Sequence, residues 1–260
     1  MLDWLKLAGV ETPPMAVHVN VTSRDALMLD LESRFKDGRG FSIATLNLDH
    51  VVKLRQDEAF RTSYAAHSHV TADGNPIVWI SKVGGEQVEL VPGSELVVPV
   101  AQLAARNNVP IALFGSSDAS LQGAAESLRG LAPSLEVAYT HAPNMQFDPD
   151  SDDAVQLISD IKASGARVVF LALGAPKQER FAARIAEQEP ELGTLSIGAG
   201  LDFLAGSQVR APKWARKLAL EWLWRLMKNP ARLWKRYRDC FVILPGLAVR
   251  AVQLRGRSTT

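Results

Sequence analysis

Residues 168–188 read VVFLALGAPKQERFAARIAEQ and combine two patterns from which the fold can be inferred. The apolar, β-branched run at 168–174 predicts a buried strand. Glycine and proline follow in the junction at 174–179, and the spacing of apolar residues in Lys177–Gln188 predicts a helix. A buried strand that leads directly into an amphipathic helix is the repeating unit of an α/β protein.

The same alternation continues along the rest of the chain. Further strands are predicted at 16–21, 41–47, 69–72, 110–115, 136–140 and 193–199. Helical patterns between them cover 94–107, 117–131 and 151–164. We therefore expect an α/β fold with a Rossmann-like, mainly parallel sheet that carries helices on both faces.

Composition excludes several other classes of protein. The chain has 260 residues, of which 47% are apolar and 22% charged, so intrinsic disorder, collagen and a coiled coil are excluded as the main architecture. Cys240 is the single cysteine, which excludes an intramolecular disulfide framework and a cysteine-based zinc site. Residues 1–14 resemble no secretory signal, and no run of about 20 apolar residues predicts a membrane-spanning helix.

Charge is distributed unevenly along the chain. Residues 208–260 contain 13 Lys and Arg against 2 Asp and Glu, a net charge of +11, whereas residues 1–207 contain 16 against 26, a net charge of −10. The basic part also holds four of the six tryptophans, namely Trp214, Trp222, Trp224 and Trp234. We predict a basic, Trp-rich helical appendage at 208–260. It has one helix over 213–228, a second that opens at Pro230, and an apolar stretch over 241–252 that Pro245 and Gly246 interrupt.

This appendage has the composition of a segment that docks on a membrane. Basic residues beside tryptophans on short helices are typical of the membrane interface. Each Lys or Arg near an anionic leaflet contributes about 1 kcal/mol, so several together are enough for docking. The alternatives are a helical subdomain packed on the core, or an oligomer interface, which allows for a homo-oligomer. The charge alone also permits nucleic-acid binding, but no recognition motif supports it.

Polar and glycine residues follow five of the predicted strands. These junctions are Thr45–Asp49, Ala72–Asn75, Phe114–Asp118, Gly174–Glu179 and Gly198–Asp202. In parallel sheets, ligands bind beyond the carboxyl ends of the strands, so the five junctions predict one rim of a binding crevice. The alternative for each single junction is that its residues cap helices and form turns.

At these motifs the sequence resembles the WecG/TagA/CpsF family of bacterial glycosyltransferases, glycosyltransferase family 26. The resemblance extends from about Val17 to Pro245. Its carriers in the body are Thr45-Leu46-Asn47, Ala72-Asp73-Gly74, Leu113-Phe114-Gly115 and the residues 173–179 and 198–206. Its strongest carriers are Arg210-Ala211-Pro212, the residues 220–226 and Asn229-Pro230-Ala231-Arg232.

The resemblance implies an activity and a cellular location. Family members transfer a sugar from a UDP-sugar to a saccharide on a polyprenyl diphosphate carrier, at the cytoplasmic face of the membrane, in the synthesis of a surface polysaccharide. They invert the anomeric configuration and need neither a metal nor another cofactor. The donor sugar is N-acetylmannosamine, its uronic acid or glucose. Residues 1–207 would form the catalytic domain, and residues 208–260 would close the active site and contact the membrane.

Asp73 is the predicted general base. Inversion requires a group that removes the proton from the acceptor hydroxyl, and the family places its proposed catalytic aspartate in this motif. The predicted substrate-binding residues are Thr45, Asn47, Gly74, Gly115, Lys177, Gln178, Gly200, Asp202, Arg225 and Arg232. The two arginines are the candidates for the diphosphate, because an arginine binds phosphate oxygens through two parallel hydrogen bonds. For each of these residues the alternative is a cap, a turn or a solvated side chain.

Three further features bear on function. Asp150 and Asp152 form the Asp-x-Asp pattern of metal-dependent glycosyltransferases, but they precede a predicted helix, and we interpret them as capping residues. Asn75-Pro76 and the residues 144–147 depart from the family pattern, which affects the predicted sugar pocket. The competing functions are a non-catalytic, membrane-recruited partner of a polysaccharide assembly complex and a nucleotide-binding oxidoreductase, which would need a glycine fingerprint near the N-terminus.

Overall fold

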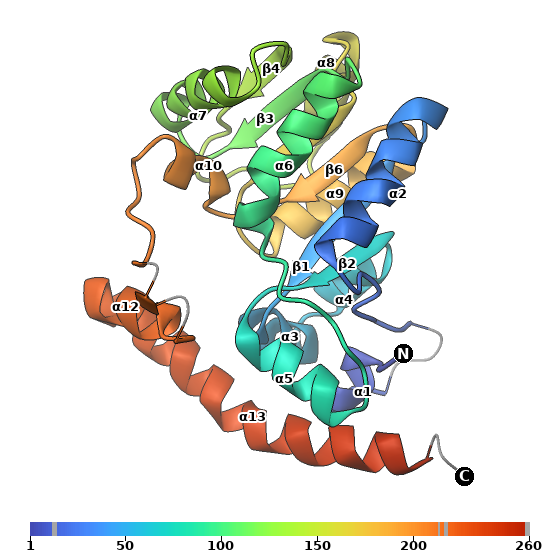
Figure 1. The fold of residues 1–260 in the computed structure, drawn as a ribbon, viewed down its shortest axis with the longest axis vertical. Coiled ribbons are helices and arrows are strands. Elements are labelled where there is room, and N and C mark those ends of the chain that lie inside the picture. Colours follow the sequence, from blue (N-terminus) through green and yellow to red (C-terminus); the bar gives the residue numbers. More distant parts are fainter. Residues whose placement is uncertain (12–14, 213, 216–217, 258–260) are drawn as a thin grey trace.

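The computed structural model describes residues 1–11, 15–212, 214–215 and 218–257 (Figure 1). Its centre is a six-stranded sheet in the order β2-β1-β6-β5-β3-β4, and every neighbouring pair of strands is parallel. The strands are β1 (Phe41–Leu46), β2 (His69–Ala72), β3 (Ile111–Gly115), β4 (Val137–His141), β5 (Val168–Ala172) and β6 (Gly193–Ser196). The predicted parallel α/β sheet is confirmed.

Helices cover both faces of this sheet. On one face Leu113 and Phe170 pack with α2 (Arg24–Asp37), α6 (Gly93–Arg106) and α7 (Asp118–Leu131). On the other face Phe114 and Leu171 pack with α8 (Asp152–Ala163) and α9 (Lys177–Gln188). Because successive side chains of a strand point to opposite faces, one apolar run such as β3 supplies both layers of the core.

The remaining helices gather around the β1–β2 side of the sheet. These are α1 (Trp4–Ala8), α3 (Leu48–Gln56), α4 (Glu58–Ala65) and α5 (Asn75–Val83). A short helix, α10 (Gly200–Leu204), follows β6 and packs against α6 and α7. The chain ends in α12 (Glu221–Lys228) and α13 (Pro230–Arg257), and α13 runs beneath α3, α5 and α1 (Figure 1).

The strand predicted at 16–21 is wrong. Val17, Val19 and Val21 are buried as the alternating pattern required, but the segment forms no ladder with the neighbouring strand β2. The side chain of Asn20 makes hydrogen bonds to the backbone of 68–70 that the backbone of a paired strand would otherwise make. Its Oδ1 accepts a hydrogen bond from the Val70 N–H at 2.7 Å, and its Nδ2 donates to the Ser68 carbonyl at 2.8 Å.

Two predictions for the appendage are also wrong. A single helix over 213–228 is not formed, because Ala219 lies in a turn with φ +58° and α12 begins at Glu221; residues 213, 216 and 217 lie outside the described part. Pro245 and Gly246 do not interrupt the helix, since α13 continues through both residues. Its buried residues Ile243 and Leu247 pack against the body on either side of Pro245, which compensates for the hydrogen bond that proline cannot donate. Pro230 opens α13 as predicted.

The second half of α13 is built into the hydrophobic core of the body. Ile243, Leu247 and Ala251 are spaced four residues apart and form one inward face of the helix. They belong to the same apolar cluster as Trp4 of α1 and Ile80 of α5. The appendage is therefore anchored by ordinary core packing, and its first half extends from this anchor toward the ends of β1 and β2.

We expect Leu247→Ala to lower the free energy of unfolding by about 2–5 kcal/mol, because it removes a fully buried side chain and leaves a cavity. The measurement is equilibrium denaturation followed by circular dichroism. Val249→Ala on the same helix is the matched control, since Val249 is 58% exposed and its truncation should change stability by less than about 0.5 kcal/mol. A loss for Leu247→Ala no greater than that of the control would contradict the anchoring role.

Candidate active site

The predicted site residues gather at the edge where the strands end. All six strands are parallel, so the junctions after β1, β2, β3, β5 and β6 face the same side of the sheet. The ends of β1 and β2 lie side by side, and the backbone N–H of Asp73 donates to the carbonyl of Leu46 at 2.7 Å. This pairing brings the residues that follow both strands into one group.

Asp73 lies at the centre of this group. Thr45 Oγ1 donates to Asp73 Oδ2 at 3.5 Å, and the Asn47 side chain also hydrogen-bonds this carboxylate. Asn47 Oδ1 accepts a hydrogen bond from the His50 N–H at 3.0 Å and so caps α3. Gly74 has φ +106°, a backbone conformation that favours glycine, and it turns the chain from β2 into α5 directly beside the carboxylate. Asp73, Thr45, Asn47 and Gly74 therefore meet as predicted.

The surroundings of Asp73 change its acidity. Burial raises the pKa of the Asp73 carboxyl group from an ordinary value of 3.8 to about 6. The positive charge of Arg225 opposes this rise, and the negative charge of Glu221 adds to it. Hydrogen bonds from Asn47 and Thr45 also oppose the rise, because they stabilise the ionised form. A carboxylate with a pKa near 6 is ionised at pH 7 and can still accept a proton, as a general base must.

Helix α12 brings Arg225 and Glu221 to the site from the appendage. Arg225 Nη2 and Glu221 Oε1 form an ion pair at 2.6 Å. The guanidinium carbon of Arg225 also lies 5.9 Å from the ring centroid of Phe203 on α10. Arg225 is still 45% exposed, so its remaining N–H groups are accessible to a phosphate. The first part of the predicted appendage therefore lies close enough to the ends of β1 and β2 for its charges to act on Asp73.

A chain of ion pairs ties α13 to the same edge. Arg236 Nε pairs with Asp49 Oδ1 at 3.1 Å, and Asp49 Oδ2 pairs with Lys53 Nζ at 2.8 Å. Lys53 Nζ also donates to the carbonyl of Ala175 at 3.1 Å, in the loop between β5 and α9. These contacts connect the appendage, the start of α3 and the loop that precedes Gln178. Arg232 lies in the first turn of α13, but its side chain is outside the described residues.

Gln178 is buried and forms hydrogen bonds with two loops of the site edge, the one after β5 and the one after β6. Its Oε1 accepts hydrogen bonds from the Gly174 N–H at 3.3 Å and from the Gly198 N–H at 3.1 Å. Its neighbour Lys177 does not join these contacts. Lys177 Nζ donates instead to the carbonyl of Met145, in the loop after β4, at 3.0 Å. Gln178 thus lies at the predicted edge, with its amide oxygen already occupied by backbone groups.

Internal packing explains the other predicted residues. A Cβ on Gly115 would lie 2.5 Å from the carbonyl oxygen of Ala172, and a Cβ on Gly200 would lie 2.9 Å from Val97. Asp202 accepts hydrogen bonds from Ser116 Oγ and, at 2.8 Å, from Gln208 Nε2. These residues lie at the β3–β6 half of the edge, and their part in substrate binding stays a prediction.

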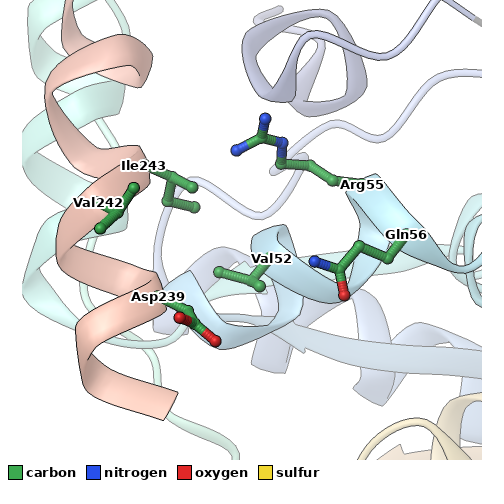
Figure 2. A pocket seen from close by; sticks show the side chains of 6 residues that line it. All are labelled: Val52, Arg55, Gln56, Asp239, Val242 and Ile243. Atoms are coloured by element: carbon green, nitrogen blue, oxygen red, sulfur yellow. The ribbon is translucent and has the colours of Figure 1, made fainter. Parts of the chain in front are cut away.

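A groove between α3 and α13 lies next to the site (Figure 2). It has a volume of about 320 Å³ and is lined by Val52, Arg55, Gln56, Asp239, Val242 and Ile243. None of these six residues belongs to the predicted site. The groove therefore borders the contact between the appendage and the body.

A comparison with known protein families shows to which family the chain belongs. The family model described as the glycosyl transferase WecG/TagA/CpsF family matches residues 13–259. The chain belongs to this family. The resemblance inferred from the motifs is confirmed, and this WecG/TagA/CpsF protein is a glycosyltransferase of cell-surface polysaccharide synthesis. Because the match extends through α12 and α13, the appendage is part of the family pattern.

Two charged partners of this glycosyltransferase's site escaped the sequence analysis. Glu221 lies four residues before Arg225, and Lys53 lies four residues after Asp49. That spacing on a helix is the signal that could have identified both pairs, because residues four apart are neighbours on the helix surface. The contact of Arg236 with Asp49 and the approach of Arg225 to Asp73 depend on tertiary packing and leave no local pattern.

The Asp-x-Asp stretch of this family member lies away from Asp73. Asp150 forms an ion pair with Arg180, and Asp152 lies in the first turn of α8, where Ser151 is the N-cap. Within the described residues, no group of three or more His, Cys, Asp or Glu is arranged to hold a metal ion. In the same residues, no helix is both long enough and apolar enough to cross a membrane.

Proposed function

We propose that this glycosyltransferase transfers a sugar from a UDP-sugar to a saccharide on a polyprenyl diphosphate carrier, with inversion and without a metal. The observation that carries the proposal is the Asp73 carboxylate at the ends of β1 and β2, with Arg225 of α12 close enough for its charge to lower the pKa of this carboxyl group. One group can accept a proton, and the other can bind a phosphate. An inverting transfer from a sugar diphosphate requires both functions.

In the proposed reaction, Asp73 takes the proton of the acceptor hydroxyl as its oxygen attacks the anomeric carbon. The new glycosidic bond forms while the bond from the anomeric carbon to the UDP oxygen breaks, so the configuration inverts. The electron pair leaves with UDP, whose growing negative charge Arg225 stabilises. Thr45 and Asn47 orient the Asp73 carboxylate and lie where they can meet hydroxyl or acetamido groups of the donor. The donor class is UDP-N-acetylmannosamine, its uronic acid or UDP-glucose.

We further propose that the outer face of α13 docks the enzyme on the inner face of the cell membrane. The exposed apolar residues of this face are Trp234, Phe241, Val242, Pro245, Val249 and Val252. They lie opposite the inward residues Ile243, Leu247 and Ala251, so α13 is apolar on two sides. The exposed basic residues Lys235 and Arg238 lie on the same side of the helix and favour anionic lipids. Docking there brings a lipid-linked acceptor to the side of the molecule that holds Arg225.

The paired substitution Val242→Ser with Val249→Ser is expected to weaken binding to vesicles of phosphatidylglycerol and phosphatidylcholine by about tenfold or more. The reason is the loss of two apolar side chains from the membrane interface. Vesicle sedimentation measures the effect, and binding of the wild-type protein should also weaken as salt is added. Leu29→Ser, at a 69% exposed position of α2, is the control. Equal binding of the double variant and the control would contradict docking through α13.

The activity itself is tested with purified protein, a detergent-solubilised polyprenyl diphosphate-linked saccharide and a panel of UDP-sugars, each with and without EDTA. We expect transfer from one donor class, unchanged by EDTA, and a product whose anomeric configuration by NMR is opposite to that of the donor. Loss of transfer with EDTA would contradict the metal-independent mechanism. No transfer from any donor and no binding of UDP would favour the non-catalytic partner of an assembly complex.

A further inference from the structure

Glu179 is a buried carboxyl group that the proposed mechanism does not use. It is the third residue of α9 and its side chain is completely buried. Its Oε1 accepts a hydrogen bond from Gln178 Nε2 at 2.8 Å, and within the described residues its Oε2 has no hydrogen-bond partner. Burial raises the pKa of the Glu179 carboxyl group to about 7, since water is excluded. Burial of a carboxyl group costs free energy, and a single hydrogen bond to Gln178 offsets only part of this cost.

The contact with Glu179 determines how the Gln178 amide is oriented. Gln178 Oε1 faces two backbone N–H groups, those of Gly174 and Gly198. Its Nε2 faces the Glu179 carboxyl oxygen. If the amide were reversed, its NH₂ group would meet two N–H donors and its oxygen would meet a carboxyl oxygen, so three hydrogen bonds would be lost. The carboxyl group thus acts together with the two glycine N–H groups to exclude the reversed orientation of the amide.

Through this orientation, Glu179 acts on two loops of the site edge. Gly174 lies in the loop between β5 and α9, and Gly198 lies in the loop between β6 and α10. Both glycines have positive φ angles, +75° and +54°, and a Cβ on either would meet no atom within 4 Å. No neighbouring atom therefore packs against the two glycines where a side chain would stand, and such packing does not hold these two turns. The two hydrogen bonds that Gln178 Oε1 accepts, from the Gly174 N–H and the Gly198 N–H, connect the two loops.

We propose that Glu179 is a positioning residue for the transfer reaction, which orients the Gln178 amide and thereby holds the β5–α9 and β6–α10 loops together at the site edge. Its charge is not needed for this role. Both the neutral acid and the carboxylate offer an oxygen to Gln178 Nε2, and so does the amide of glutamine. The effect of Glu179 on catalysis rests on the proposed function, whereas its effect on the two loops does not.

The first test measures amide hydrogen exchange of Gly174 and Gly198 by NMR, in the full chain without substrate. Glu179→Met removes the acceptor oxygen, so both amide protons should exchange at least about tenfold faster, which corresponds to about 1.4 kcal/mol. Glu179→Gln keeps the acceptor and should exchange as the wild type does. Glu187→Met, at an exposed position of α9, is the control for adding a methionine to this helix. Unchanged exchange in Glu179→Met would overturn the proposal.

The second test exchanges donor and acceptor, and it remains decisive if Glu179→Met does not fold. Gln178→Glu alone places two carboxyl groups against each other and should speed exchange of both glycine amides. Adding Glu179→Gln restores one amide donor and one carboxylate acceptor, with the same net charge as the wild type. The double variant should therefore recover slow exchange. If the second change gives no recovery, the pair does not set the loops and the proposal fails.

The kinetic test separates positioning from catalysis. Glu179→Met should raise the KM for the UDP-sugar at least about tenfold and change kcat less than threefold, because the loops hold the donor and do not move the proton. Glu179→Gln should keep both constants near those of the wild type. Equal damage in both variants would show that the charge of Glu179 matters, which contradicts the proposal. If no variant transfers sugar while the exchange results hold, the proposed function fails and the positioning role stands.

Discussion

Asp73→Asn is expected to reduce kcat by about 10²- to 10⁴-fold, which is the usual contribution of a general base. Asparagine has nearly the same shape and can keep the contacts with Thr45 and Asn47, but it cannot accept the proton of the acceptor hydroxyl. Binding of UDP should change little, because Arg225 and the loops at the edge are untouched. The measurement is steady-state transfer together with UDP titration by calorimetry.

The same variant should not be less stable than the wild type at pH 7. Burial raises the pKa of Asp73 above its value in the unfolded chain, so the folded state binds this proton more tightly. The ionised carboxylate therefore destabilises the fold as the pH rises through the range from 3.8 to about 6, and asparagine removes that cost. Thermal melting at pH 7 and at pH 4 tests this sign, since the difference should disappear at the lower pH.

Asp25→Asn is the matched control for Asp73→Asn. Asp25 is the second residue of α2, is exposed, and lies in none of the junctions that follow the strands. Its replacement should leave kcat within about twofold of the wild type. Full activity of Asp73→Asn, or equal loss in both variants, would exclude Asp73 as the base. A loss of activity together with a lower melting temperature would assign the effect to folding.

Much of the body could be predicted because its signals are local. The strand at His69–Ala72 and the helix Lys177–Gln188 were predicted with the bounds that the structure has. Gly74 follows the strand two residues after its end, and the helix lies between Pro176 and Pro190, so each element and its limits are encoded in nearby residues. The grouping of Asp73 with Thr45 and Asn47 followed from the same signals, because parallel strands bring their carboxyl ends together.

The errors occur where a distant contact decides the local structure. The valines at 17, 19 and 21 have the alternation of a strand, but the Asn20 side chain takes hydrogen bonds that a ladder would need. Pro245 has the character of a helix end, but packing of Ile243 and Leu247 keeps α13 continuous. The approach of Arg225 to Asp73 joins residues about 150 positions apart, which no periodicity encodes.

The appendage adds a second large effect, because Arg225→Ala is expected to lower kcat/KM by about 10²- to 10³-fold. This is the size of effect seen when one donor to a developing negative charge is removed. In the proposed reaction Arg225 binds the leaving diphosphate, and in the structure its guanidinium group lies against Phe203 and lowers the pKa of Asp73. Arg129→Ala is the control, since Arg129 is exposed in the last turn of α7 and has no part in the proposed site or docking face. Equal activity of the two variants would exclude Arg225 from the reaction.

The pH dependence of kcat/KM distinguishes a direct effect of Arg225 on Asp73 from a general loss of structure. In the wild type, activity should fall below a pH of about 6 as Asp73 becomes protonated. Arg225 lowers the pKa of Asp73, so Arg225→Ala should move this acid limb to higher pH. Glu221 raises that pKa, so Glu221→Gln should move the limb to lower pH. Because the two residues are partners in one ion pair, mere loss of the pair would shift both profiles in the same direction. Opposite shifts therefore require that each charge acts on Asp73 itself. Because kcat/KM reports the pKa values of the free enzyme, they would show that α12 lies near the base before substrate binds.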